Sequence, residues 1–141
     1  MPIRFFSEDV DFKPPYPRKT VAWIRNCIER EKHRVKELNY IFCSDEYLYN
    51  INVQYLNHRT YTDIITFDSS DTPGILEGDI YISIDRVKEN ARKEDTSFQT
   101  ELHRVMIHGV LHLMGYSDKA EAQKSQMRKK EDAYLSLRSF T

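Results

Sequence analysis

The sequence predicts a single α+β domain over residues 1–141, with about four strands in one mixed sheet, about five helices, and one central, buried helix. Three observations predict this class. Isoleucines at positions 80, 82 and 84 alternate, which is typical of a strand with one buried face. Several other segments place apolar residues at helical spacing. A chain of 141 residues with only four glycines and no internal repeat suits one helix-rich core.

The first half of the chain is expected to alternate strands and helices. The expected elements are an edge strand at 3–6, an extended proline segment through 17, a helix capped by Thr20 that runs to about 33, a strand at 39–43, and a helix to about 56 capped by Ser44 or Asp45. Spacing puts Leu48, Ile51 and Tyr55 on the buried face of the second helix. Asn57 tolerates the left-handed conformation that ends a helix.

The second half is expected to supply the remaining strands and the central helix. The expected elements are a polar connection at 57–63, strands at 61–67 and 78–84, a helix capped by Asp85 that runs to about 93, a capping box at 96–99 that opens the long helix, and a last helix from about 120 to 137. The long helix is apolar almost all round, which predicts burial. Its main polar strip consists of Glu101, Arg104, His108 and His112.

The long helix carries a metal-ligand pattern. His108 and His112 are four residues apart, so both imidazoles project from one face and can share one ion. Gly115 can end the helix and turn the chain back, which makes Asp118 the expected third ligand. The spacing equals that of the zinc-protease pattern H-E-x-x-H-x-x-G-x-x-H, but Gly109 replaces the catalytic glutamate. The pattern therefore predicts a three-ligand site with an open position and disfavours a peptidase.

This stretch resembles the signature H-G-x-L-H-L-x-G-Y-D-H of the YbeY family, the metal-dependent endoribonucleases of bacterial ribosomal RNA maturation. The matching positions are His108, Gly109, Leu111, His112, Leu113, Gly115 and Tyr116. Asp118 stands where the family has its third histidine, and Ser117 also departs from the signature. Further matches to the family are Leu56, Asn57, Arg59, Thr62, Asp63, Phe67 and the triplet Gly78-Asp79-Ile80. His58 stands where the family more often has an aromatic residue.

The resemblance implies a single-strand-specific endoribonuclease that acts in 16S rRNA 3′-end maturation and ribosome quality control. Its expected partners are single-stranded RNA and the small ribosomal subunit. One Zn²⁺ per chain would be held by His108, His112 and Asp118, although nickel, iron or copper suit the same ligands. Arg59 is expected to bind the substrate phosphate and to neutralise charge in the transition state. Attack by water and attack by the RNA 2′-hydroxyl both stay open.

Two other functions fit the same residues. One is a metal-dependent hydrolase of a peptide or small molecule, which the missing glutamate and the phosphate-suited Arg59 disfavour. The other is a ribosome-assembly factor with a structural metal. A structural zinc usually has four protein ligands, and three are evident here.

Composition adds limits on environment and partners. The net charge of −1 disfavours binding of nucleic acid through bulk positive charge, but it permits a local basic cleft. Cys27 and Cys43 are expected to be buried thiols in a reducing compartment. No segment approaches the roughly 20 apolar residues of a membrane span, and residues 1–9 lack an apolar signal core, so we expect a cytoplasmic protein. The other histidines (His33, His58 and His103) are expected not to be ligands, and Asp79 is expected to be structural.

Overall fold

The computed structural model describes residues 2–140 and contains one four-stranded mixed sheet. The strands are β1 (Ile3–Ser7), β2 (Arg34–Cys43), β4 (Ile75–Ser83) and β3 (Ile64–Asp68), in that spatial order. The first three strands are parallel, and β3 pairs antiparallel with β4 at the edge. The predicted edge strand at 3–6 and the mixed sheet are therefore confirmed.

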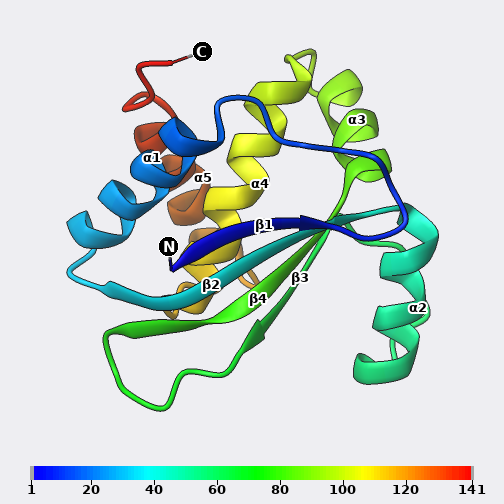
Figure 1. Ribbon diagram of the computed structural model, residues 1–141, viewed down its shortest axis with the longest axis horizontal. Helices are drawn as coiled ribbons and strands as arrows, with labels where there is room; N and C mark the ends of the chain where they lie inside the picture. Colours follow the sequence, from blue (N-terminus) through cyan, green and yellow to red (C-terminus); the bar gives the residue numbers. More distant parts are fainter. Residues whose placement is uncertain (1, 141) are drawn as a thin grey trace.

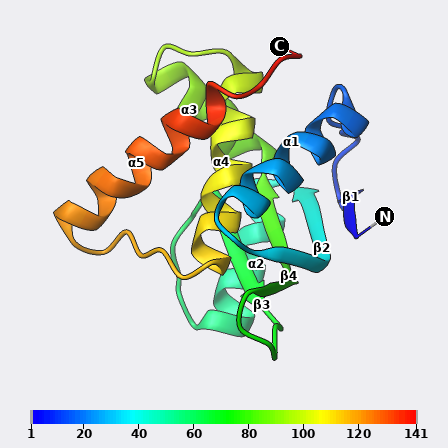
Figure 2. The same ribbon diagram turned by 90° about the vertical axis from the view of Figure 1, so that its left-hand side faces the viewer.

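Five helices surround the sheet, as the sequence predicted. They are α1 (Pro17–Arg30), α2 (Asp45–Leu56), α3 (Ile84–Lys93), α4 (Phe98–Leu113) and α5 (Glu121–Leu135). Three of them, α1, α4 and α5, lie over one face, and α3 lies beside α4 (Figures 1 and 2). A small second cluster, which includes Leu48, Ile51 and Ile65, packs α2 on the other face. No helix within residues 2–140 is long and apolar enough to cross a membrane.

The helix that carries the histidine pair is the centre of the main core. Its residues Leu102, Met106, Ile107, Val110 and Leu111 have no exposed surface. It starts at Ser97, whose hydroxyl accepts a hydrogen bond from the backbone N–H of Thr100 at 3.1 Å. The predicted central helix is confirmed, although its cap is Ser97 and not a capping box that starts at Thr96.

Two predicted helix starts are wrong. Helix α1 begins at Pro17, because a proline at the first position is preset to a helical φ and needs no N–H donor there. Thr20 lies inside the helix, where its hydroxyl donates to the Tyr16 carbonyl at 2.8 Å. Helix α3 begins one residue after Ser83, whose hydroxyl caps it in place of the predicted Asp85.

Several boundaries and one buried position also differ from prediction. Strands β2 and β4 begin several residues earlier than expected, because pairing between them continues through polar residues such as Arg34 and Glu77. Strand β3 starts at Ile64 and not at Tyr61. Tyr55 is 70 % exposed and not buried as predicted, although its ring centroid lies 6.1 Å from that of Phe67 on β3. In contrast, the Ser44 cap and the left-handed Asn57 at the end of α2 are confirmed.

Candidate metal centre

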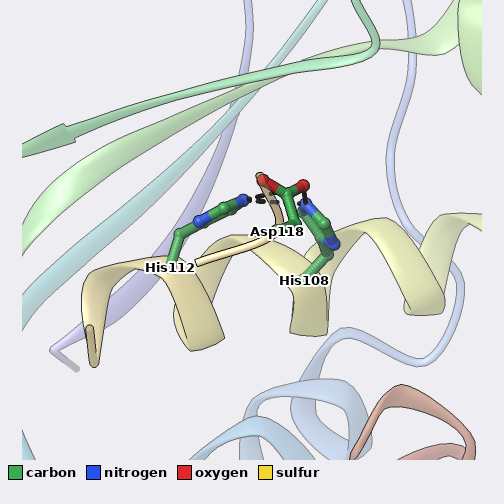
Figure 3. A group of neighbouring side chains, drawn as sticks. All are labelled: His108, His112 and Asp118. Carbon is green, nitrogen blue, oxygen red and sulfur yellow. Dashed lines mark hydrogen bonds and ion pairs between the residues drawn. The ribbon is translucent and has the colours of Figure 1, made fainter. Parts of the chain in front are cut away.

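The three predicted ligands lie together above α4. His108 and His112 project from one face of the helix, and the chain turns after Leu113 and returns with Asp118 (Figure 3). The two Nε2 atoms are 2.9 Å apart, and Asp118 Oδ2 lies 3.3 Å from one and 3.5 Å from the other. Gly115, with φ of 102°, makes the predicted left-handed turn between them.

Hydrogen bonds at the far side of each ring set which nitrogen is free. His108 Nδ1 lies 2.6 Å from Glu131 Oε2, and His112 Nδ1 lies 3.0 Å from the Tyr116 carbonyl oxygen. A carboxylate and a carbonyl only accept hydrogen bonds, so each Nδ1 must carry the hydrogen. In the neutral rings both Nε2 lone pairs are then free, and they point toward Asp118.

This donor set fits a divalent metal ion. A tetrahedral ion with bonds of about 2.1 Å places its ligands roughly 3.4 Å apart, close to the separations between Asp118 and the two imidazoles. Two imidazole nitrogens and one carboxylate oxygen suit zinc and several neighbouring transition metals. All three donor atoms lie within 4.8 Å of one another. Three protein ligands leave one position for water or substrate.

Glu131, on α5, contacts a candidate ligand and was not predicted from the sequence. Its side chain is buried, and Arg104 Nη1 donates to its Oε1 at 2.9 Å while Oε2 accepts from His108. Burial lowers the pKa of His108, but the hydrogen bond and the negative charge of Glu131 outweigh it and raise that pKa overall. One signal was available. Position 131 lies between Met127 and Tyr134 on the apolar stripe of α5, where an unpaired carboxylate is costly.

A second polar cluster holds the turn between the ligands. The Glu31 carboxylate, at the end of α1, accepts from Tyr116 Oη at 2.6 Å and from Lys130 Nζ at 2.9 Å, and it also accepts from the Tyr134 hydroxyl. The Tyr116 carbonyl is the group that orients His112. Helices α1 and α5 therefore fix the turn that carries both this carbonyl and Asp118.

Two hollows meet at the cluster and share Asp63, His108 and Asp118. The first hollow has a volume of about 330 Å³ and lies between α4 and α5, with Glu101, Arg104, Lys124, Arg128 and Glu131 among its lining residues. The second has a volume of about 530 Å³ and lies beside β3 and the loop after α2, with Asn52, His58, Thr60, Thr62, Thr66 and His112 among its lining residues. The candidate metal centre thus lies between two open hollows, where an extended substrate has access from both sides.

The other predicted site residue, Arg59, is on the loop after α2. Its side chain is exposed, and within the described chain it is not among the residues that line either hollow. Its neighbours His58 and Thr60 both line the second hollow. The phosphate role of Arg59 therefore stays a prediction.

The residues that were expected not to be ligands are outside the group formed by His108, His112 and Asp118. They are His33, His58, His103 and Asp79. His33 Nδ1 lies 2.7 Å from the Glu31 carbonyl oxygen. His103 is fully buried against Trp23, with ring centroids 5.2 Å apart. Asp79 accepts a hydrogen bond from Asn39 Nδ2 at 3.0 Å, between neighbouring strands.

Gly109 packs directly against the sheet. A Cβ atom at this position would lie 2.9 Å from Ile64 Cδ1 and 3.0 Å from Ile80 Cδ1. A glutamate side chain therefore has no room there in this packing. The position that supplies the general base in the zinc-protease pattern supplies none here.

Comparisons with known proteins identify a family. A family model described as Endoribonuclease YbeY matches residues 6–138. A protein of that description from Cytophaga hutchinsonii is 52 % identical over 138 residues, which cover 98 % of this chain and 96 % of the relative. One from Amoebophilus asiaticus is 47 % identical, covering 94 % of this chain and 90 % of the relative. The solution structure of TM1509 from Thermotoga maritima matches with a TM-score of 0.66 and 27 % identity, covering 94 % of this chain and 86 % of that one.

Proposed function

This chain belongs to the endoribonuclease YbeY family, and we propose that it is a metal-dependent endoribonuclease that hydrolyses phosphodiester bonds of single-stranded RNA. The observation that carries the proposal is the convergence of three free donor atoms, from His108, His112 and Asp118, between two open hollows. We propose one ion per chain, and zinc as that ion, because the donor set suits it.

Different residues of the chain would hold the metal ion and bind the RNA phosphate. His108, His112 and Asp118 would hold the ion, while Glu131 and the Tyr116 carbonyl keep each Nε2 directed at it. A bound zinc ion supplies Lewis-acid polarisation of a phosphate oxygen and lowers the pKa of a water molecule. Arg59 would reach the phosphate from the loop beside His58 and Thr60 and oppose the growing negative charge. The two imidazoles and the carboxylate lie on a rigid helix and a braced turn, so their geometry is preset.

The biological setting is proposed from family membership. We propose that residues 1–141 act as one hydrolase domain in the cytoplasm, in 16S rRNA 3′-end maturation and ribosome quality control, with the small ribosomal subunit as partner. Single-stranded RNA suits the site, because an unpaired strand can pass through the two hollows on either side of the cluster.

The proposed activity is tested by offering several polymers to the zinc-loaded protein. Labelled single-stranded RNA, the same RNA in a perfect duplex, single-stranded DNA and an unfolded protein are incubated separately. We expect cleavage of the single-stranded RNA alone. Cleavage of the unfolded protein, or of none of the polymers, would contradict the proposal, and unfolding on chelation without RNA cleavage would favour a structural metal.

The ends of the RNA products distinguish the two modes of attack. Attack by the 2′-hydroxyl breaks the P–O5′ bond and leaves a 2′,3′-cyclic phosphate and a 5′-hydroxyl. Attack by water leaves one linear phosphate and one hydroxyl. Mass spectrometry of the fragments identifies which pair forms.

A further inference from the structure

Two cationic side chains of α5 line the first hollow beside the candidate metal centre. Lys124 and Arg128 are four residues apart, so they project from one face of the helix, and both share this hollow with His108 and Asp118. Their side chains are 57 % and 50 % exposed. The cations therefore stand at the mouth of the hollow and not in the protein interior.

Both charges are available to a ligand. Lys124 Nζ lies 3.7 Å from Glu121 Oε1, whose side chain is 95 % exposed, and Arg128 Nη2 lies 3.7 Å from Glu94 Oε2, which is 53 % exposed. Such long, solvent-exposed ion pairs contribute little and exchange readily with another anion. Arg104 lines the same hollow but is committed, because it donates at 2.9 Å to Glu131 and at 2.7 Å to Asp132.

The carboxylates of this hollow do not cancel the cations at its mouth. Glu101 and Glu131 lie on its floor, 6 % and 4 % exposed. Glu131 is neutralised by Arg104 and bonded to His108, and Asp118 belongs to the candidate ligand set. Burial raises the pKa of Glu101, and Asp63 Oδ2 accepts a hydrogen bond from Asn90 Nδ2 at 3.2 Å.

We propose that Lys124 and Arg128 form a phosphate-binding subsite that holds the backbone of single-stranded RNA next to the bond that is cleaved. This subsite rests on the proposed function. It specifies where the RNA backbone binds and across which part of the site the strand runs. One phosphate of the strand contacts the α5 face, and the strand crosses the ligand cluster into the second hollow.

The second hollow suits a nucleoside better than a phosphate. None of the described residues that line it is a lysine or an arginine. Besides Asp63 and the three candidate ligands, its polar groups are the hydroxyls of Thr60, Thr62 and Thr66, the Asn52 amide and the His58 ring. Ile64 and Ile65 add apolar surface. Neutral donors and acceptors beside an apolar wall match a base and its ribose, whereas the cationic mouth of the first hollow matches a phosphate.

The test compares two charge-matched double variants, Lys124→Gln with Arg128→Gln, and Lys88→Gln with Lys129→Gln. The control residues are exposed lysines outside the lining of both hollows, and Lys129 is on the same helix. Binding of a short fluorescent single-stranded 2′-O-methyl RNA to zinc-loaded protein is measured by anisotropy over a range of salt concentrations. Cleavage of unmodified RNA is measured in parallel, and thermal unfolding and zinc content verify that each variant is intact.

We expect RNA binding to weaken in the Lys124→Gln/Arg128→Gln variant and not in the control variant. Losing the contact to this phosphate should make the slope of log K against log salt shallower by about 0.7 and weaken binding roughly fivefold at about 0.1 M salt. The control variant should bind and cleave like the wild type. Two outcomes would overturn the subsite but not the proposed endoribonuclease activity. One is an equal effect in both double variants, and the other is no effect in either variant while the wild type still cleaves RNA. Failure of the wild type to bind or cleave any RNA would overturn both.

Discussion

The imidazole of His108 on α4 is bonded to the buried carboxylate of Glu131 on α5, with 2.6 Å between Nδ1 and Oε2. The two residues are 23 positions apart in the chain, and each lies on its own helix. The contact fixes the ring, places the hydrogen on Nδ1, and leaves Nε2 for a metal ion. Helix α5 is therefore part of the candidate metal centre, although it supplies none of the three predicted ligands.

Replacing Glu131 with glutamine should weaken metal binding. Glutamine can still accept the hydrogen bond from His108, but it removes the negative charge that strengthens the imidazole as a ligand. We expect zinc affinity to fall about 10–100-fold, measured by competition with a coloured chelator. Asp132→Asn is the control, because Asp132 also contacts Arg104 but is 59 % exposed and touches no ligand. Equal affinities in Glu131→Gln and wild type would refute this role.

Asp118 should behave as a ligand that depends on its charge. Asp118→Asn should lower zinc affinity, because a neutral amide oxygen is a poorer ligand than a carboxylate. Asp118→His should retain one zinc per chain, since imidazole is also a good zinc ligand. Metal content after dialysis gives the answer for both variants. If Asp118→Asn keeps its metal and its activity, a group other than Asp118 completes the site.

Glu31 should stabilise the turn between the ligands. Its carboxylate, 9 % exposed, accepts hydrogen bonds from Tyr116, Tyr134 and Lys130. Glu31→Gln removes the negative charge of the carboxylate. The new amide also brings N–H donors to a site where all three partners are already hydrogen-bond donors. We expect the free energy of unfolding in urea to fall by about 1–3 kcal/mol. Glu29→Gln, at a neighbouring exposed carboxylate, is the control. An equally large loss of unfolding free energy in Glu29→Gln would argue against a specific role of Glu31.

His103 should make stability depend on pH. Burial, together with the charge of Arg138, lowers the pKa of His103 from 6.5 to about 4. Between these values the unfolded chain binds a proton that the folded protein excludes, so the free energy of unfolding falls as the pH falls. The loss should reach about 3 kcal/mol between pH 6.5 and 4.

Urea unfolding at several pH values checks this contribution of His103. His103→Phe keeps an aromatic ring against Trp23 and Phe140 and removes the titrating group. Its stability should vary less over this pH range than that of the wild type. His58→Phe, the same substitution at an exposed histidine, serves as the matched control. Identical pH profiles for His103→Phe and wild type would show that His103 does not titrate as described.

Local signals in the sequence predicted the parts of the fold that depend on short-range order. The spacing of apolar residues on α4 and the four-residue separation of His108 and His112 are set within one helix. The Ser44 cap of α2 depends on a contact with Tyr47, three residues away, and was also predicted. Gly115 is likewise a local feature of the turn.

Contacts between distant segments explain what the sequence did not predict. Glu131 is recognisable only when α5 is known to pack beside His108, and Glu31 only when α1 is known to meet the motif turn. The early start of β2 depends on pairing with β4, about 40 residues later. Pro17 was ambiguous, because proline occurs both in extended segments and at the first position of a helix.

The most direct test of metal-dependent RNA cleavage at this site is to restore activity with metal after its removal. Protein stripped with a chelator is titrated with Zn²⁺ while cleavage of 5′-labelled single-stranded RNA is followed, and His112→Ala is purified and treated in parallel. We expect no cleavage by the stripped protein, a rise in rate that levels off at one Zn²⁺ per chain, and no rise in the variant. Cleavage that survives the chelator, or that is equal in His112→Ala, would show that the chemistry does not occur at His108, His112 and Asp118.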